Sequence, residues 1–140
     1  MNLPSTQNEG DVQSPESNEQ RPCVLFVDDE EAVRRLGARA LRSAGFDVLL
    51  AADGVEAVDC FKLEYRRIGV VVMDMTMPRM TSAAAAEIMH SVCASVPLIV
   101  STGFSCDDTA NELVGVAATL QKPYRINTLI ETVRQVLVRP

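Results

Sequence analysis

The sequence predicts an α/β fold in which a doubly wound parallel sheet of five strands carries helices on both faces. Short apolar runs without polar alternation occur five times after Pro22. Between them lie longer segments in which apolar residues recur every three or four positions. Continuous apolar runs are typical of strands covered on both faces, and regular alternation of β and α elements favours parallel pairing. The abundance of Val, Leu, Ile, Ala and Met predicts an aliphatic core.

The five apolar runs have the length of buried strands. In chain order they are 23–28, 46–51, 70–74, 97–102 and 116–121. Each of these runs is four to eight residues long, which suits a strand better than a helix.

The helices are predicted from apolar stripes with a spacing of 3.6 residues. The first stripe ends at Gly45, a residue type that commonly follows a helix C-terminus. The fourth stripe, between residues 106 and 114, is weak. The other four consist of Val33, Leu36, Ala40, Leu41 and Ala44; of Val55, Val58, Phe61 and Leu63; of Ile88, Met89 and Val92; and of Ile126, Leu129, Ile130, Val133, Val136 and Leu137.

The first 21 residues differ in composition from the remainder. They are rich in Ser, Asn, Gln, Pro and Gly and contain few apolar residues, so we expect a disordered tail or linker over 1–21 and one domain over 22–140. No stretch approaches the roughly 20 apolar residues of a membrane helix. Four cysteines occur without a C-x-x-C pair. We therefore expect a cytoplasmic protein that has free thiols and does not insert into a membrane.

The charge distribution argues against a nucleic-acid-binding protein. The formal net charge is −6, whereas such proteins carry a basic stripe that displaces counterions from phosphates. Arg34, Arg35, Arg39 and Arg42 are predicted to form the solvated face of one helix. His90 and Cys93 have a ligand-like spacing, but two ligands do not complete a zinc site.

Polar residues with related chemistry follow four of the predicted strands. They are Asp28, Asp29, Asp74, Thr102 and Lys122. In a parallel sheet these strand ends share one edge, where ligands bind near the reversal of strand order. Adjacent carboxylates repel each other and favour a hard cation such as Mg²⁺. We therefore predict that Asp74 attacks phosphorus beside Mg²⁺, while Thr102 and Lys122 stabilise the phosphoryl oxygens.

Each of these residues also has an ordinary structural explanation when it is considered alone. An Asp after a strand often caps the next helix, Lys-Pro is a common loop dipeptide, and Asp53-Gly54 is a common turn or helix start. The combination of suitable residue types at four strand ends favours the functional site.

Five segments resemble the receiver domain of bacterial response regulators and hybrid histidine kinases. They are VLFVDDEEAVR (24–34), AADGVEAV (51–58), VVVMDMTMPRM (70–80), PLIVSTGF (97–104) and LQKPY (120–124). The resemblance extends over the chain outside the tail. It implies a flavodoxin-like (βα)5 fold with strand order 2-1-3-4-5.

The resemblance also implies a role for each acidic residue. Asp74 resembles the phosphoacceptor and Asp29 the direct Mg²⁺ ligand. Asp28 would bind the ion through water or shape the site. Thr76 would bind it through the backbone carbonyl.

Further positions concern the switch that follows phosphorylation. Thr102 and Lys122 resemble the family's hydroxyl residue and lysine, and the proline after that lysine is commonly cis. Thr119 departs from the family pattern, because an aromatic residue usually precedes the lysine by three positions. Ser82 departs as well, because the M-P-x-M-x-G motif usually ends in Gly. These departures leave the acceptor unchanged and put the output mechanism and the turn before the third helix in question.

We accordingly expect a phosphorelay receiver that takes a phosphoryl group from a histidine kinase or histidine phosphotransfer protein and changes conformation. It would not be a turnover enzyme. The change would reach the face formed by the fourth helix, fifth strand and fifth helix, where a homodimer could form. Whether the chain is a stand-alone receiver or part of a hybrid kinase stays open.

Two alternatives compete with this function. One is a degenerate receiver that acts as a binding scaffold independently of phosphorylation, which Thr119 and Ser82 keep open. The other is a phosphatase of the haloacid dehalogenase class. That class resembles D-x-D-x-T, and Asp74-Met75-Thr76 lacks its second Asp.

Overall fold

The computed structural model describes residues 21–76, 80–103 and 113–138. Five parallel strands form one sheet in the order β3-β2-β4-β5-β6. Numbered along the chain this order is 2-1-3-4-5, so the predicted fold class is confirmed. The strands are β2 (Cys23–Val27), β3 (Asp47–Ala51), β4 (Ile68–Asp74), β5 (Leu98–Thr102) and β6 (Val116–Gln121).

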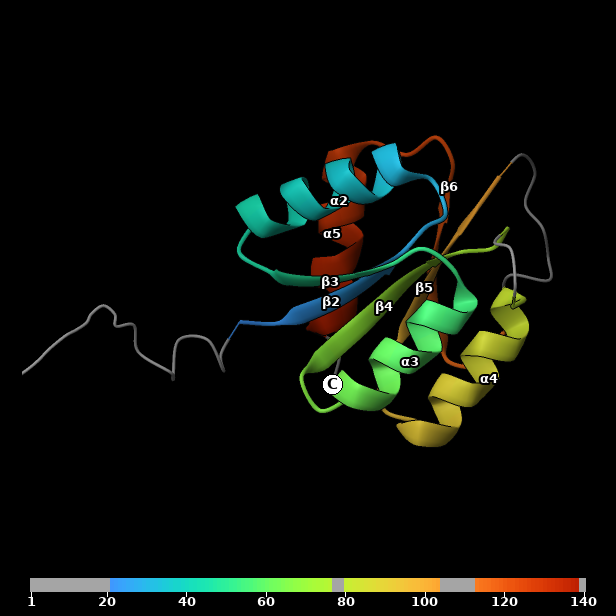
Figure 1. The fold of residues 1–140 in the computed structure, drawn as a ribbon. Coiled ribbons are helices and arrows are strands. Elements are labelled where there is room, and N and C mark those ends of the chain that lie inside the picture. Colours follow the sequence, from blue (N-terminus) through green and yellow to red (C-terminus); the bar gives the residue numbers. More distant parts are fainter. Residues whose placement is uncertain (1–20, 77–79, 104–112, 139–140) are drawn as a thin grey trace, which may run out of the picture.

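Helices cover both faces of the sheet (Figure 1). On one face lie α2 (Glu31–Ser43) and α5 (Ile126–Leu137), which contact each other. On the other face lie α3 (Gly54–Glu64) and α4 (Ser82–Val92), which also pack together. Within the described residues no helix is long and apolar enough to span a membrane.

The core consists of two apolar clusters, one on each face of the sheet. Leu25 and Met73 belong to the cluster under α3 and α4, whereas Phe26 and Val72 belong to the cluster under α2 and α5. Successive residues of a strand point to opposite faces, so the central strands β2 and β4 supply both clusters. These two strands are held rigidly, and their carboxyl ends are therefore fixed in space.

Two helix boundaries agree with the sequence signals. Gly45 follows the end of α2 with φ +103°, a conformation that favours glycine. Asp53 is the N-cap of α3, and its Oδ1 accepts a hydrogen bond of 2.9 Å from the Glu56 backbone N–H. The Asp53-Gly54 pair is therefore a helix start.

Two predicted core positions are wrong. Leu36 and Leu63 are 56% and 83% exposed. At 100° per residue, Leu63 lies 200° around the helix from buried Phe61, and Leu36 lies 140° from buried Leu41. The predicted helix between 106 and 114 falls mostly outside the described residues, as does the tail, so the domain boundaries stay a prediction.

Candidate functional site

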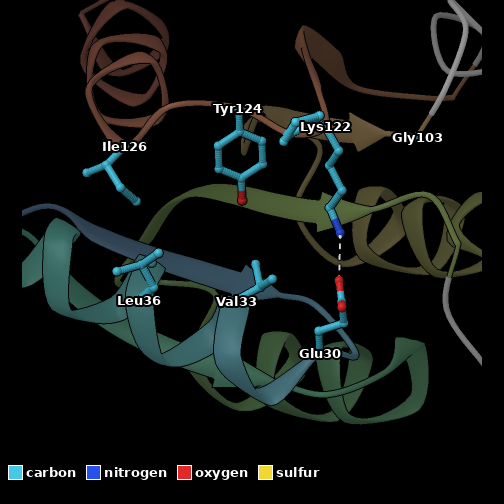
Figure 2. Close-up of a pocket in the computed structure, with 9 residues that line it drawn as sticks. Glu30, Val33, Leu36, Gly103, Lys122, Tyr124 and Ile126 are labelled. Atoms are coloured by element: carbon cyan, nitrogen blue, oxygen red, sulfur yellow. Dashed lines mark ion pairs between the residues drawn. The ribbon is translucent and has the colours of Figure 1, made fainter.

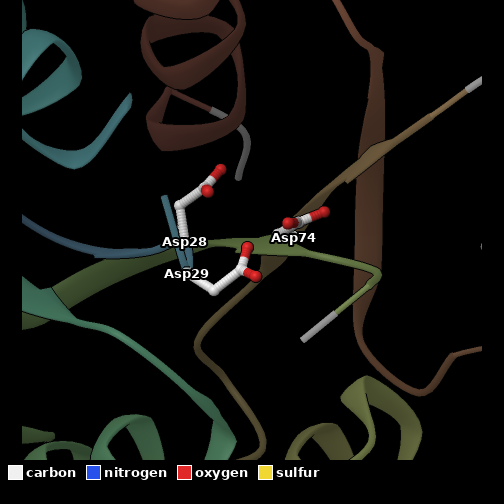
Figure 3. Close-up of side chains that lie close together, drawn as sticks. All are labelled: Asp28, Asp29 and Asp74. Atoms are coloured by element: carbon white, nitrogen blue, oxygen red, sulfur yellow. The ribbon is translucent and has the colours of Figure 1, made fainter. Parts of the chain in front are cut away.

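Three carboxylates meet at the carboxyl edge of the sheet (Figure 3). Strands β2 and β4 are neighbours, with Val27 paired to Met73, and the next residues are Asp28 and Asp74. One oxygen from each of Asp28, Asp29 and Asp74 lies within 4.8 Å of the others. Asp28 and Asp74 are 1% exposed, whereas Asp29 is exposed to solvent.

Lys122 brings a positive charge to this cluster from the far edge of the sheet. Its Nζ lies 2.9 Å from Asp28 Oδ2, 3.3 Å from Asp74 Oδ2 and 3.8 Å from Glu30 Oε1. The Lys122 backbone N–H donates a hydrogen bond of 2.7 Å to the Thr102 carbonyl, and the following peptide bond to Pro123 is cis. Strand β6 and the loop after it thus position Lys122 beside the carboxylates.

Burial and charge pairing together shift the pKa values of Asp74 and Lys122. Burial is the largest influence on Asp74 and raises its pKa, because the charged form loses water. The Thr76 backbone N–H and the Lys122 ammonium act in the opposite direction but do not cancel it. For Lys122, burial alone would lower the pKa, yet its hydrogen bonds and attraction to Asp28 and Asp74 outweigh burial and raise it.

Thr76 and Thr102 both lie near Asp74 in the fold. The backbone N–H of Thr76 donates to Asp74 Oδ1 at 3.2 Å, and its hydroxyl lies 3.4 Å from the same oxygen. Thr102 ends β5 one residue after Ser101, which pairs with Asp74. Thr102 is 7% exposed. The structure therefore gathers all six predicted site residues at one edge, while their chemical roles stay predictions.

Two residues of this site were not predicted. Arg34 was expected on a solvated face, but it is half-buried, and its Nη1 donates a hydrogen bond of 2.7 Å to the Asp28 carbonyl. Arg35, Arg39 and Arg42 are exposed as predicted. The spacing of the arginines does not distinguish Arg34 from the exposed arginines of the same helix, because its partner, the Asp28 carbonyl, lies outside the helix.

Ser82 is the second unpredicted site residue. It is 2% exposed, and its hydroxyl donates a hydrogen bond of 2.7 Å to the Asp74 carbonyl. The N-cap of α4 is instead Thr81, whose Oγ1 accepts from the Ala84 N–H at 3.1 Å. Ser82 thus connects the first turn of α4 to the Asp74 carbonyl at the end of β4.

The donor set fits a hard divalent cation. Three carboxylates and one ammonium give a formal charge of −3 + 1 = −2, and an ion bound by oxygens would offset it. Carboxylates with room for water are the ligands that Mg²⁺ prefers. In the described part of the chain no other set of three such ligands lies this close, and His90 and Cys93 belong to no metal cluster there.

Comparison with known proteins assigns these features to one family. The family model described as "Response regulator receiver domain" matches residues 24–134. A sensor kinase CckA of Brucella abortus is 34% identical over 116 residues, covering 81% of this chain and 12% of that protein. A response regulator MprA of a Mycobacterium species is 33% identical over 120 residues, covering 83% of this chain and 50% of that protein. The chain therefore spans half or less of the length of these relatives.

Solved structures agree with the fold. The receiver domain of a hybrid histidine kinase CckA has a TM-score of 0.70 and 33% identity, with 82% of this chain and 98% of that chain covered. A receiver domain protein from Clostridium thermocellum has a TM-score of 0.78, with 83% and 94% of the two chains covered. At 24% identity this second likeness supports the fold alone.

Proposed function

Because the chain belongs to the response regulator receiver domain family, we propose that it accepts a phosphoryl group on Asp74 from a partner's phosphohistidine. One observation supports this above all. The Asp74 carboxylate is buried at the end of a central strand, 3.3 Å from the Lys122 ammonium and beside Asp28 and Asp29. A nucleophile on a rigid element, surrounded by charges that match a phosphoryl group, is what phosphoryl transfer requires.

The proposed reaction is an exchange of one bond at phosphorus. An Asp74 carboxylate oxygen attacks phosphorus and forms an acyl phosphate, while the phosphorus–nitrogen bond of the donor breaks. The imidazole nitrogen keeps the electron pair of that bond. Hydrolysis would later return the carboxylate and inorganic phosphate, so the chain carries one phosphoryl group at a time.

Lys122 and Thr102 would act on the phosphoryl oxygens. The Lys122 ammonium already lies between Asp28 and Asp74, so a short side-chain movement could bring it to a new anion on Asp74. The phosphorylated residue carries about −1.5 to −2 charges at neutral pH. We infer that the Thr102 hydroxyl donates a hydrogen bond to one of its oxygens, which would shift β5 and β6.

Asp28, Asp29 and the Thr76 carbonyl, together with Asp74, would hold Mg²⁺. The bound ion would offset negative charge on the phosphoryl oxygens. The buried position of Asp28 suits it to shaping the site, since its Oδ1 accepts from the Glu30 N–H at 3.0 Å. Asp29 is exposed and can bind an ion that arrives from solvent.

The partner would be a histidine kinase or a histidine phosphotransfer protein, in line with the similarity to a sensor kinase and to a hybrid-kinase receiver domain. The net charge of −6 makes direct nucleic-acid binding by this domain unfavourable. Cys23, Cys60 and Cys93 are free thiols, which favours a reducing, cytoplasmic location.

The conformational change would be transmitted without the aromatic residue that family members usually have three positions before the lysine. Thr119 occupies that position on the edge strand β6 and is exposed. We propose that a homodimer forms through the face of β6, α5 and the helix expected between 106 and 114, which lies mostly outside the described residues. Size measurement with and without phosphorylation tests it.

Intact mass after incubation with acetyl phosphate and Mg²⁺ tests the acceptor. Wild type should gain one phosphoryl group, and Asp74→Asn should gain none. Asp59→Asn, at an exposed position on α3, is the matched control and should label like wild type. Undiminished labelling of Asp74→Asn would refute the assignment.

An NMR titration and a turnover assay, added to this experiment, separate the alternatives. If wild type takes no phosphate, and Mg²⁺ perturbs no NMR signal near Asp74, the chain is a phosphorylation-independent scaffold. Sustained turnover of a phosphate ester would instead indicate a phosphatase.

A further inference from the structure

The Lys122 ammonium is shared among three carboxylates that differ in their surroundings. The side chains of Asp28 and Asp74 are almost completely buried, at 1% and 2% exposed. The third carboxylate belongs to Glu30, whose side chain is 66% exposed and lies 3.8 Å from Lys122 Nζ. Of the three carboxylates that contact Lys122, Glu30 is therefore the one most exposed to solvent.

Helix capping does not explain this position of Glu30. The residue is the N-cap of α2, yet its side chain makes no capping hydrogen bond. Ser, Thr, Asp and Asn are the residue types that stabilise this position. The Glu30 side chain instead extends across to Lys122 (Figure 2).

The Glu30–Lys122 pair connects two loops across one end of a groove. The groove has a volume of about 420 Å³, and its walls include Val33, Leu36 and Tyr124. The Tyr124 ring lies between the α5 side and Lys122 (Figure 2), and burial raises its pKa to about 12. Apolar walls limit the water that can screen the pair from that side.

We propose that Glu30 is a positioning residue for Lys122 and slows the phosphorylation of Asp74 by dianionic donors. The inference rests on the proposed function. The Glu30 carboxylate holds the ammonium toward the α2 side, in competition with the phosphoryl oxygens. It also adds a negative charge near the path of an anionic donor, and such charges lower the rate of association.

The rate of labelling by acetyl phosphate at saturating Mg²⁺ tests this role. The variants are Glu30→Gln, which removes the charge and keeps the shape, and Glu30→Asp, which keeps the charge. Glu31→Gln is the matched control, because Glu31 is also exposed but pairs with Arg35 at 3.8 Å. Each is measured at about 0.1 M and about 1 M salt, where the Debye length falls from about 10 Å to about 3 Å.

Glu30→Gln should label about two- to fivefold faster than wild type at low salt, and the gain should largely disappear at high salt. Glu31→Gln should stay near the wild-type rate, whereas Glu30→Asp, which keeps the charge on a shorter side chain, should have a rate between those of wild type and Glu30→Gln. The gain should be smaller with phosphoramidate, which carries less negative charge than acetyl phosphate. This dependence on salt and donor charge would not follow from a purely structural role.

Four results would overturn the inference. If wild type labels at Asp74 and Glu30→Gln labels at the same rate, Glu30 has no such role while the proposed function stands. An equal gain in Glu31→Gln would show a general effect of net charge. A changed thermal midpoint with an unchanged rate would make Glu30 a helix-stabilising residue. Wild type that takes no phosphate would overturn both the inference and the proposed function.

Discussion

Gly37→Ala should destabilise the protein, although alanine is the better helix former. Gly37 is a buried position on the face of α2 that packs against the sheet. A Cβ added there would lie 2.6 Å from Phe26 Cζ and 2.7 Å from Phe26 Cε2. Phe26 is 1% exposed and belongs to the apolar cluster under α2 and α5, so its ring can move away only if its neighbours in that cluster shift.

Two opposing effects determine the size of the loss. Alanine should gain about 1 kcal/mol over glycine from helix propensity. Overpacking a rigid core costs about 1–3 kcal/mol, and two ring atoms that must each retreat by about 1 Å put this site at the upper end. The net loss in free energy of unfolding is therefore about 2 kcal/mol. With an unfolding entropy of about 2.1 cal/mol/K per residue, the thermal midpoint should fall by about 9 °C for roughly 110 folded residues.

Urea denaturation and calorimetry of the metal-free protein measure this loss. Gly103→Ala is the matched control, because a Cβ there meets nothing within 4 Å and should change stability by less than about 0.5 kcal/mol. Phe26→Leu should remove the clash, so Gly37→Ala should cost little in that background. The two substitutions should then show a coupling of about 2 kcal/mol.

Two results would contradict the predicted clash between a side chain at position 37 and Phe26. If Gly37→Ala is as stable as wild type or more so, the close packing of α2 on Phe26 is not rigid. An equal cost in the Phe26→Leu background would show that the loss comes from elsewhere in the helix.

Three further predictions concern the site and its supporting helices. At a Mg²⁺ concentration about 100 times its dissociation constant, the free energy of unfolding of wild type should rise by about 2.7 kcal/mol, whereas that of Asp29→Asn should rise much less. Equal shifts of the thermal midpoint in the two proteins would contradict the metal site. Burial raises the pKa of Asp74, so the native chain binds the carboxyl proton of Asp74 more tightly than the unfolded chain does. The resulting contribution to the free energy of unfolding is present below about pH 4 and is lost as pH rises through the raised pKa. Metal-free Asp74→Asn should therefore be more stable than wild type near about pH 7 and lose this advantage toward about pH 4; urea melts that show a constant difference would disprove it. Asp53→Ala should lose about 1 kcal/mol by denaturant titration, since it removes the N-cap hydrogen bond of α3, and no loss would show that water replaces that bond.

Much of the fold could be predicted because the signals are local. An uninterrupted apolar run such as the one around Val71 identifies a buried strand, and parallel order follows from the alternation with helices. The same logic placed Asp28, Asp74 and Lys122 at one edge, and the structure has them there.

The misses arise where the outcome depends on contacts outside the residue's own helix. Leu36 matches a helical stripe but faces a groove rather than the core, because periodicity does not define the edge of the buried face. Arg34 and Ser82 bond to carbonyls in other elements, and residue type alone does not reveal such partners. The position of the Glu30 side chain depends on a lysine far along the chain.

Because Lys122 follows the last strand, β6, the order in which the chain is synthesised affects how the site is assembled. Asp28 and Asp29, which follow β2, and the proposed acceptor Asp74, which ends β4, emerge early, whereas the lysine lies 48 residues beyond Asp74. β6 is an edge strand that pairs with β5, so the Lys122 ammonium reaches the carboxylates only when β6 pairs with β5. A nascent or clipped chain that ends before β6 would lack the lysine that pairs with Asp28 and Asp74, so under the proposed function its phosphate uptake would require a complete sheet.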